Sequence, residues 1–175
     1  MRLHAFADEA KERGYIMVAA LLAPNKLAPA RQSIRSLIMP GQRRIHFQKE
    51  SNGRRKQILD TVSTLGVEAI VYDGSRHVAD KPSRDACLGH LVIDLLERDV
   101  ERLIVETEDP SLRTDRSLIY AKLRSAGDGH DFQYAHLRSY EECLLAIPDA
   151  IAWSWAKGGH WRARVSELVT DVRDV

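Results

Sequence analysis

Three carboxylates lie at positions where an acidic side chain needs an explanation. Asp8 follows the apolar run LHAFA and shares a strand face with Phe6 under the two-residue alternation of a β-strand. Glu106 ends the run Leu103–Val105, which is typical of a strand covered on both sides. Asp149 falls in an expected helix, where the residues three and four positions away are all apolar. A buried carboxylate is unfavourable unless a cation, a metal ion or hydrogen bonds compensate it.

These three acids would suit a hard divalent cation if the fold brought them together. Mg²⁺ and Mn²⁺ prefer carboxylate oxygens, and Mg²⁺ usually keeps several waters. Two such ions about 4 Å apart can activate a water molecule and stabilise the leaving oxygen in phosphodiester cleavage. We therefore predict a metal site with catalytic carboxylates at Asp8, Glu106 and Asp149, and Mg²⁺ or Mn²⁺ as the cofactor.

Each acid also has a purely structural interpretation. Asp8 could be a solvated strand end, and Asp149 could pair with an arginine such as Arg138 or Arg162. Glu9 follows Asp8 directly, so strand alternation turns it to the opposite face and leaves it out of the predicted site. The geometry of the acids decides between these interpretations and the metal site.

Two further residues bear on the same site. His46 alternates with Ile45 and Phe47, so it faces away from them and is a candidate proton shuttle or phosphate contact; a structural histidine is the alternative. Pro148 cannot donate a helix hydrogen bond, which predicts a kink just before Asp149.

Positive charge is concentrated in one segment, which we predict to contact nucleic acid through Arg43, Arg44, Lys49, Arg54, Arg55 and Lys56. A solvated basic face is the alternative. A second candidate is the stretch KGGHWRAR at 157–164. Its Trp161 could stack on a base, with Arg162 on a phosphate, or could instead fasten the tail to the core.

The elements that must position these residues alternate between strands and helices. Strands are expected at 4–7, 15–22, 44–47, 67–72, 103–105 and 132–137, the first two joined by a turn at 11–14. Helices are expected at 26–38, at 52–65 with Asn52 as N-cap, from an N-cap at Ser83, at 109–127, from a capping box of Ser139 and Glu142 to Gly158, and within 165–175. This order predicts an α/β fold: a mixed sheet that starts with a β-hairpin and has helices on both faces.

The composition limits the class of protein. A chain of 175 residues, with 44% hydrophobic and 29% charged residues, is expected to form one globular domain over 1–175. The formal net charge of +1 gives no global field for a polyanion, and no apolar run approaches the ~20 residues of a membrane span. Cys87 and Cys143 lie far apart in apolar contexts, which favours buried thiols in a reducing cytoplasm. We expect a cytoplasmic protein without a membrane partner.

Four stretches, in their order along the chain, resemble a known family. FADEA (6–10) and the following hairpin GYIMVAALL (14–22) are similar to the opening strand and hairpin of domain-of-unknown-function family 3800, in the ribonuclease H-like superfamily. RIHF (44–47) resembles a short strand of that family, and LAIPDAIAW (145–153) resembles its acid-bearing C-terminal helix. The resemblance covers most of the chain and implies a divergent member with a ribonuclease H-like fold.

The resemblance also implies roles for the three acids. Asp8 would be the first-strand metal ligand, Glu106 the acid of an inner strand and Asp149 the ligand from the last helix. The inner-strand acid is Glu where Asp is more usual in the family. The family's Ser, Gln and Ala at three further positions are replaced by Ala10, Ala146 and Pro148. These departures fit a divergent enzyme and also one that has lost activity.

Two main functions follow as hypotheses. The first is a divalent-metal-dependent nuclease that hydrolyses phosphodiester bonds of RNA or DNA through the carboxylate cluster. The second is a catalytically inactive ribonuclease H-like domain that binds nucleic acid or a protein partner. A third, an α/β domain with a small-ligand site at its strand ends, has less support. Convergence of Asp8, Glu106 and Asp149 would favour the first.

Overall fold

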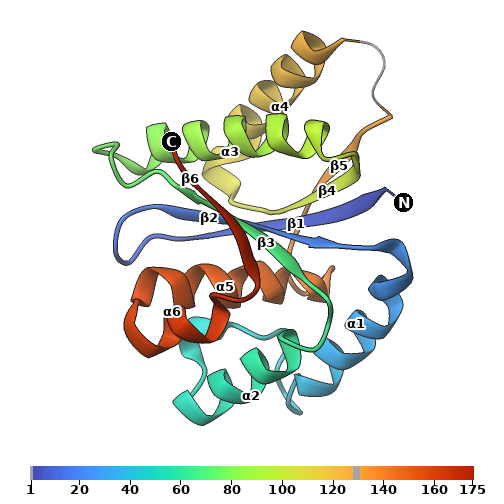
Figure 1. The fold of residues 1–175 in the computed structure, drawn as a ribbon, viewed down its shortest axis with the longest axis vertical. Coiled ribbons are helices and arrows are strands. Elements are labelled where there is room, and N and C mark those ends of the chain that lie inside the picture. Colours follow the sequence, from blue (N-terminus) through green and yellow to red (C-terminus); the bar gives the residue numbers. More distant parts are fainter. Residues whose placement is uncertain (1, 128–130) are drawn as a thin grey trace.

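A six-stranded mixed β-sheet forms the centre of the structure, a computed structural model that describes residues 2–127 and 131–175 (Figure 1). Its strand order is β5-β4-β1-β2-β3-β6. The strands are β1 (Leu3–Ala10), β2 (Ile16–Leu22), β3 (Glu68–Asp73), β4 (Val100–Glu106), β5 (Gln133–Leu137) and β6 (Val169–Asp174). The helices are α1 (Pro24–Leu37), α2 (Asn52–Val62), α3 (Asp80–Glu97), α4 (Leu112–Ala126), α5 (Ala146–Lys157) and α6 (Gly159–Val165), with the 3₁₀ turns η1 (Phe47–Lys49), η2 (Asp109–Ser111) and η3 (Cys143–Leu145).

The first two strands form the expected antiparallel hairpin and lie at the centre of the sheet. Asp8 in β1 pairs with Val18 in β2, and the other edge of β1 pairs in parallel with β4. All seven residues of β2 are buried, which is why its sequence is continuously apolar. The prediction of a mixed α/β sheet that begins with a hairpin and carries helices on both faces is confirmed.

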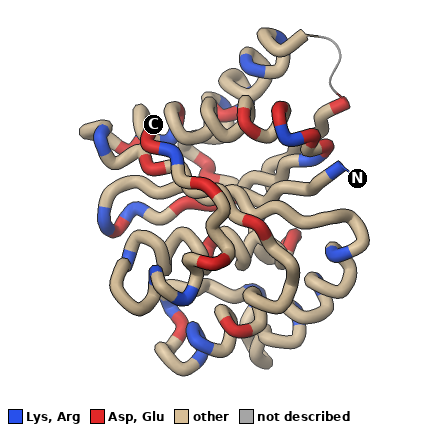
Figure 2. Tube along the Cα trace, in the orientation of Figure 1, with Lys and Arg blue, Asp and Glu red and all other residues tan. Residues whose placement is uncertain are grey.

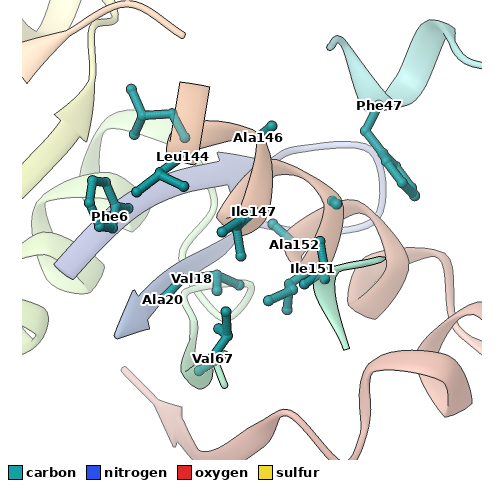
Figure 3. Packing of buried hydrophobic residues seen from close by; sticks show 14 of the residues in the cluster. Phe6, Val18, Ala20, Phe47, Val67, Leu144, Ala146, Ile147, Ile151 and Ala152 are labelled. Carbon is teal, nitrogen blue, oxygen red and sulfur yellow. The ribbon is translucent and has the colours of Figure 1, made fainter. Parts of the chain in front are cut away.

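The two faces of the sheet pack against different helices. On one face, Phe6 and Val18 pack with Ile147 and Ile151 of α5 (Figure 3), and α1, α2 and α6 complete this layer. Helices α3 and α4 cover the opposite face (Figure 1). Because Asp8 lies two residues after Phe6, strand alternation turns it toward the α5 side.

Two expected elements are wrong. Residues 44–46 form a loop and Phe47 begins η1, although the side chains of Ile45 and Phe47 are buried as a strand pattern would require. Their alternation therefore reflects contact with the core and not pairing with a sheet. The expected helix at 165–175 is largely the strand β6, which pairs in parallel with β3 and makes β5 the fifth strand of six.

Two predicted helix starts are also displaced. Ser51, not Asn52, caps α2, because its Oγ accepts the backbone N–H of Arg54 at 3.3 Å. Helix α3 begins directly after Ala79, and the Ser83 hydroxyl donates back to the Ala79 carbonyl at 2.9 Å. A serine can cap a helix or bond back by one turn, and the sequence does not distinguish these uses.

The predicted capping box of Ser139 and Glu142 does not form. The Ser139 hydroxyl instead accepts a hydrogen bond from Arg44, and the Glu142 carboxylate accepts the N–H of Leu144 at the start of η3. The long expected helix is thus divided into η3 and α5. Both side chains are used for tertiary and local contacts that precede the helix.

No helix within 2–127 and 131–175 is long and apolar enough to cross a membrane. Cys87 is buried and Cys143 is half-buried, and both are free thiols. Cys87 therefore packs as a small apolar residue.

The cap of α2 can be tested directly. Ser51→Ala should lower the free energy of unfolding by about 1 kcal/mol, because the N–H of Arg54 loses its acceptor. Asn52→Ala is the matched control and should change stability by less than about 0.5 kcal/mol. Chemical denaturation of both variants gives the comparison; a larger loss in the Asn52 variant would contradict the observed cap.

Candidate active site: a carboxylate-lined cleft

A cleft of about 600 Å³ opens at the carboxyl ends of β1 and β4, beside the first turn of α5. Its lining includes Asp8, Glu106 and Asp149. Strands β1 and β4 are parallel neighbours, so their carboxyl ends meet at one edge of the sheet. Helix α5 packs on the same face of β1 and β2 and contributes its acid from there. The structure thus brings the three acids, distant in sequence, to one cleft.

Asp149 is placed by the beginning of α5. The preceding Pro148 lies in the first turn of this helix, where amide groups have no partner within the helix in any case. The helix therefore continues from Ala146 to Lys157, and the kink predicted before Asp149 is wrong.

The carboxylate of Asp149 is held by a backbone hydrogen bond and not by an arginine. Its Oδ2 accepts the N–H of Phe47 at 3.1 Å. Arg138 pairs instead with Asp109 at 2.7 Å, and Arg162 donates to a backbone carbonyl of α5. Burial raises the pKa of Asp149 to about 6, although the hydrogen bond from Phe47 opposes the shift. The alternative of an ion pair with Arg138 or Arg162 is therefore wrong.

Asp8 is surrounded by negative charge. Its Oδ1 accepts the backbone N–H of Glu9 at 2.8 Å. Burial raises the pKa of Asp8 well above its usual value, and repulsion from Asp149 raises it further. Glu9 and Glu106 act in the same direction. A freely solvated strand end would feel neither effect, so the environment of Asp8 differs from that simple interpretation.

Glu106 has one bound and one open carboxylate oxygen. Its Oε1 accepts the N–H of Ser139 at 3.3 Å. Its Oε2 is buried and has no hydrogen-bond partner among the described residues. Burial raises the pKa of Glu106 to about 7, against the opposing effects of the Ser139 N–H and of Arg44. An unpartnered buried oxygen is unfavourable, and it is available to a ligand in the cleft.

Arg44 and His46 line the cleft from the loop before η1. The Arg44 guanidinium donates to the Ser139 hydroxyl at 2.8 Å and lowers the pKa values of Glu106 and Asp149. Burial lowers the pKa of His46, and the positive charge of Arg44 lowers it further, which favours the neutral imidazole. The His46 Nδ1 is buried without a partner among the residues that the structure describes.

Sequence reasoning missed part of the acidic lining. The carboxylates of Glu9, Glu12 and Glu108 join the three predicted acids, whereas Lys11 and Arg44 are the basic side chains that line the cleft. Strand alternation correctly turns the Glu9 carboxylate toward α3, but at a strand end this residue still reaches the cleft. The signal for this was its place next to Asp8 at the end of β1. Acidic side chains therefore outnumber basic ones in the lining of the cleft.

The donor set fits a hard cation, although the side chains are not arranged as ligands. Within 2–127 and 131–175, no three His, Cys, Asp or Glu side chains are grouped so that they could hold a metal ion. Asp8, Glu106 and Asp149 nevertheless offer only carboxylate oxygens, which are the ligands of Mg²⁺ and Mn²⁺. That these three residues hold such an ion stays a prediction.

Two members of the basic segment are engaged within the protein. Arg54 contacts Glu50 at 3.2 Å and donates to the Leu37 carbonyl. Arg55 donates to the Phe47 carbonyl at 3.0 Å. These guanidinium groups fasten α2 to the neighbouring loop, which reduces their availability to a phosphate.

Arg44 is also engaged, through Ser139, whereas the other three cations of the segment are more accessible. Arg43, Lys49 and Lys56 are exposed, and the guanidinium of Arg43 lies 4.3 Å from the ring centre of Tyr140. Figure 2 shows Lys and Arg interspersed with Asp and Glu along the chain, in line with the net charge of +1. Any contact with nucleic acid would thus be local, and it stays a prediction.

The second basic stretch belongs to the core and its border. Trp161 is only 5% exposed and packs edge-on against Trp153, with ring centres 5.4 Å apart. Arg162 lies over the Trp155 ring and donates to the Trp155 carbonyl at 2.9 Å. The ring of Trp161 therefore attaches the tail to the core, and its stacking on a base stays a prediction.

Comparisons with known proteins bear on the fold. The RNase HII chain in the structure of the PCNA:RNase HII complex from Archaeoglobus fulgidus is similar, with a TM-score of 0.58 and 17% sequence identity. The similarity covers 94% of the present chain and 77% of that chain. No protein-family model and no curated protein matches the sequence. At this identity the likeness shows the fold alone, and that fold is ribonuclease H-like.

Proposed function

We propose that this protein is a divalent-metal-dependent nuclease that hydrolyses phosphodiester bonds of RNA or DNA. The observation that carries the proposal is the placement of Asp8, Glu106 and Asp149, from β1, β4 and α5, in the lining of one cleft. The likeness of the fold to RNase HII supports it. Divergent membership of family 3800 and a cytoplasmic location are parts of the same proposal.

The electrostatics of the cleft favour a bound cation. Burial and repulsion from Asp149 raise the pKa of Asp8, which means that the carboxylates destabilise one another when ionised. A divalent ion held by Asp8, Glu106 and Asp149 would relieve that repulsion, and when bound it would lower the pKa of a water molecule and polarise a phosphate. A cation would also make the negative cleft accessible to a polyanion.

Two other side chains have roles in this proposal. Arg44 lies in the cleft and would donate to a non-bridging phosphate oxygen, orienting the backbone of the substrate. The lowered pKa of His46 favours its neutral form, and its Nδ1, which has no partner among the described residues, would accept or hold a proton near the phosphate. The exposed cations Arg43, Lys49 and Lys56 would contact flanking phosphates.

A second candidate is a catalytically inactive domain that binds nucleic acid or a protein partner. The observation that favours it is that the described residues contain no three acids already grouped as metal ligands. The replacement of the family's Ser, Gln and Ala by Ala10, Ala146 and Pro148 points in the same direction.

Metal binding can be measured by thermal unfolding. Mn²⁺ at a hundred times its dissociation constant should stabilise the wild-type protein by about 2.7 kcal/mol, because it binds only the folded state. Asp8→Asn should abolish this stabilisation. It should also leave the metal-free protein as stable as the wild type or more stable, because one of the repelling charges is removed.

Asp73→Asn is the matched control for this measurement. Asp73 also ends a central strand and also accepts a nearby backbone N–H, from Ser75 at 2.9 Å, but it does not line the cleft. This variant should retain the full response to Mn²⁺. Equal responses in the wild type and in Asp8→Asn would reject the metal site.

Cleavage of labelled single-stranded and duplex RNA and DNA tests the activity itself. The wild type should cleave at least one of these in the presence of Mn²⁺ and none with excess EDTA. Asp149→Asn should reduce the rate by at least about a hundredfold, because it removes a metal ligand. Binding of a substrate without cleavage, under conditions where Mn²⁺ binds, would favour the inactive domain.

The pH dependence of stability has a defined sign. The pKa values of about 7 for Glu106 and about 6 for Asp149 exceed those of the unfolded chain, so the folded state binds more protons between about pH 4 and pH 7. The metal-free protein should therefore lose stability as the pH rises from 5 to 8. Mn²⁺ should stabilise it most at pH 8, where the ligands are free of protons.

Glu106→Gln tests the origin of that slope. This variant should show a smaller loss of stability between pH 5 and pH 8 than the wild type, whereas Glu167→Gln, at an exposed position, should not differ from it. Urea denaturation at several pH values gives both slopes. A stability that rises over this range in the wild type would contradict the raised pKa values.

A further inference from the structure

Arg84 is a buried cation directly behind the cleft. It lies on α3, which covers the face of the sheet opposite to α5, and it is 2% exposed. Its Nη1 lies 2.8 Å from Glu9 Oε1 and 3.5 Å from Glu108 Oε2. Glu9 and Glu108 both line the cleft, one on β1 and the other just after β4. One guanidinium nitrogen thus joins the ends of two neighbouring strands.

This connection lies where the pairing between the two strands stops. The parallel register of β1 and β4 ends at Ala7 and Val105. Asp8 and Glu106 are the next residues, so the two acids stand just beyond the last paired position. Arg84 continues the link between the strands past that point by an ionic contact.

The Arg84 guanidinium is also held by contacts to α4, on the side away from the cleft. Asp115 on α4 is fully buried and accepts from Arg84 Nε at 3.0 Å and from Nη2 at 2.8 Å. His136 on β5 contacts the same carboxylate at 3.0 Å. Burial acts to raise the pKa of Asp115, but the hydrogen bonds from His136 and Arg84 keep it below its usual value. A two-pronged contact of this kind fixes the plane of the guanidinium as well as its position.

We propose that Arg84 is a positioning residue that clamps the ends of β1 and β4 through Glu9 and Glu108 and thereby fixes the separation of Asp8 and Glu106. The proposal rests on the proposed metal-dependent function. The clamp reaches Asp8 by a short path, because the backbone N–H of the clamped Glu9 donates to the Asp8 carboxylate at 2.8 Å.

Stability alone is a weak reason for such a buried network. Ion pairs removed from water lose solvation that their attraction only partly restores, and apolar side chains of similar size often serve stability equally well. The geometry of the network offers a better reason. Lys11 contacts the same two carboxylates, Glu9 and Glu108, but it is partly exposed and lines the cleft. Arg84 is the buried cation of the network, and it contacts these acids from the face of the sheet opposite to α5.

The first test measures Mn²⁺ affinity by calorimetry. Arg84→Lys keeps the charge but loses the planar fork, so it cannot hold Asp115 and Glu9 in the same way. The clamp predicts that Mn²⁺ affinity falls at least about tenfold in this variant, as for other residues that orient ligands. Asp115→Asn weakens the two-pronged contact that holds the Arg84 guanidinium, so it should also lower Mn²⁺ affinity. This variant replaces Arg84→Lys in the test if Arg84→Lys does not fold.

Tyr72→Phe is the matched control. It removes a partly buried side-chain hydrogen bond between the sheet and the same helix α3, from the Tyr72 hydroxyl to Asp94 at 3.1 Å. Its Mn²⁺ affinity should stay within about twofold of the wild type. Wild-type Mn²⁺ affinity in Arg84→Lys would overturn the clamp, because a positive charge alone would then be sufficient. An equal loss of affinity in Tyr72→Phe would also overturn it, because general loosening of the contact between the sheet and α3 would then explain the result.

Hydrogen exchange tests the clamp in the absence of metal. The clamp and the proposed metal-dependent function can therefore be rejected independently of each other. Amides of residues 8–11 and 106–109 should exchange at least about tenfold faster in Arg84→Lys, while those of β3 stay as in the wild type. Unchanged exchange at the two strand ends would overturn the clamp. A wild-type protein that binds no Mn²⁺ would overturn the metal-dependent function, and faster exchange at these ends would then still establish the clamp as a structural link.

Discussion

Repulsion between carboxylates that are partly removed from water is the constraint on which this structure depends. Asp8, Glu106 and Asp149 share one cleft, and burial raises the pKa of each. The fold stabilises their ionised forms with one backbone N–H apiece. These donors come from three separate segments: Glu9, Ser139 and Phe47. Ser139 and Phe47 must therefore lie outside the strands of the sheet at the cleft, whereas Glu9 remains in β1, where it pairs with Met17.

That requirement explains the loop at 44–46. Its alternating side chains would suit a strand, but the N–H of Phe47 is directed to Asp149 and not to a neighbouring strand. The same loop carries Arg44 and His46 into the cleft. On the other face of the sheet, Arg84 supplies positive charge close to Glu9, so the two faces support the same strand ends by different means.

The elements fixed by local pattern could be predicted from the sequence. The hairpin, the apolar strand β2 and the face on which Asp8 lies all follow from alternation and burial. Features that depend on tertiary pairing could not be predicted in this way. Strand β6 exists because β3 offers an open edge, and the capping serine of α2 is chosen by the path of the preceding loop.

The same distinction applies to the candidate site. Asp8, Glu106 and Asp149 were recognisable because an acid among apolar residues is conspicuous. Arg84 and Asp115 gave no such signal, since each lies on a helix that also has a polar face and their pairing spans 31 residues. Glu9 was excluded by strand alternation, which holds within a strand and loses force at its last positions.

The charge of the cleft bears on both candidate functions, nuclease activity and partner binding. A polyanion that enters this cleft meets the six carboxylates of its lining, with Arg44 and Lys11 as the opposing charges. Without a divalent cation, nucleic acid would be repelled from the cleft itself and would have to bind elsewhere, near the exposed Lys49 and Lys56. A cleft that binds no metal would therefore suit a cationic group of a partner protein better than a phosphate. Under the proposed function, metal binding would therefore decide both whether the cleft supports cleavage and which chemical class of partner it accepts.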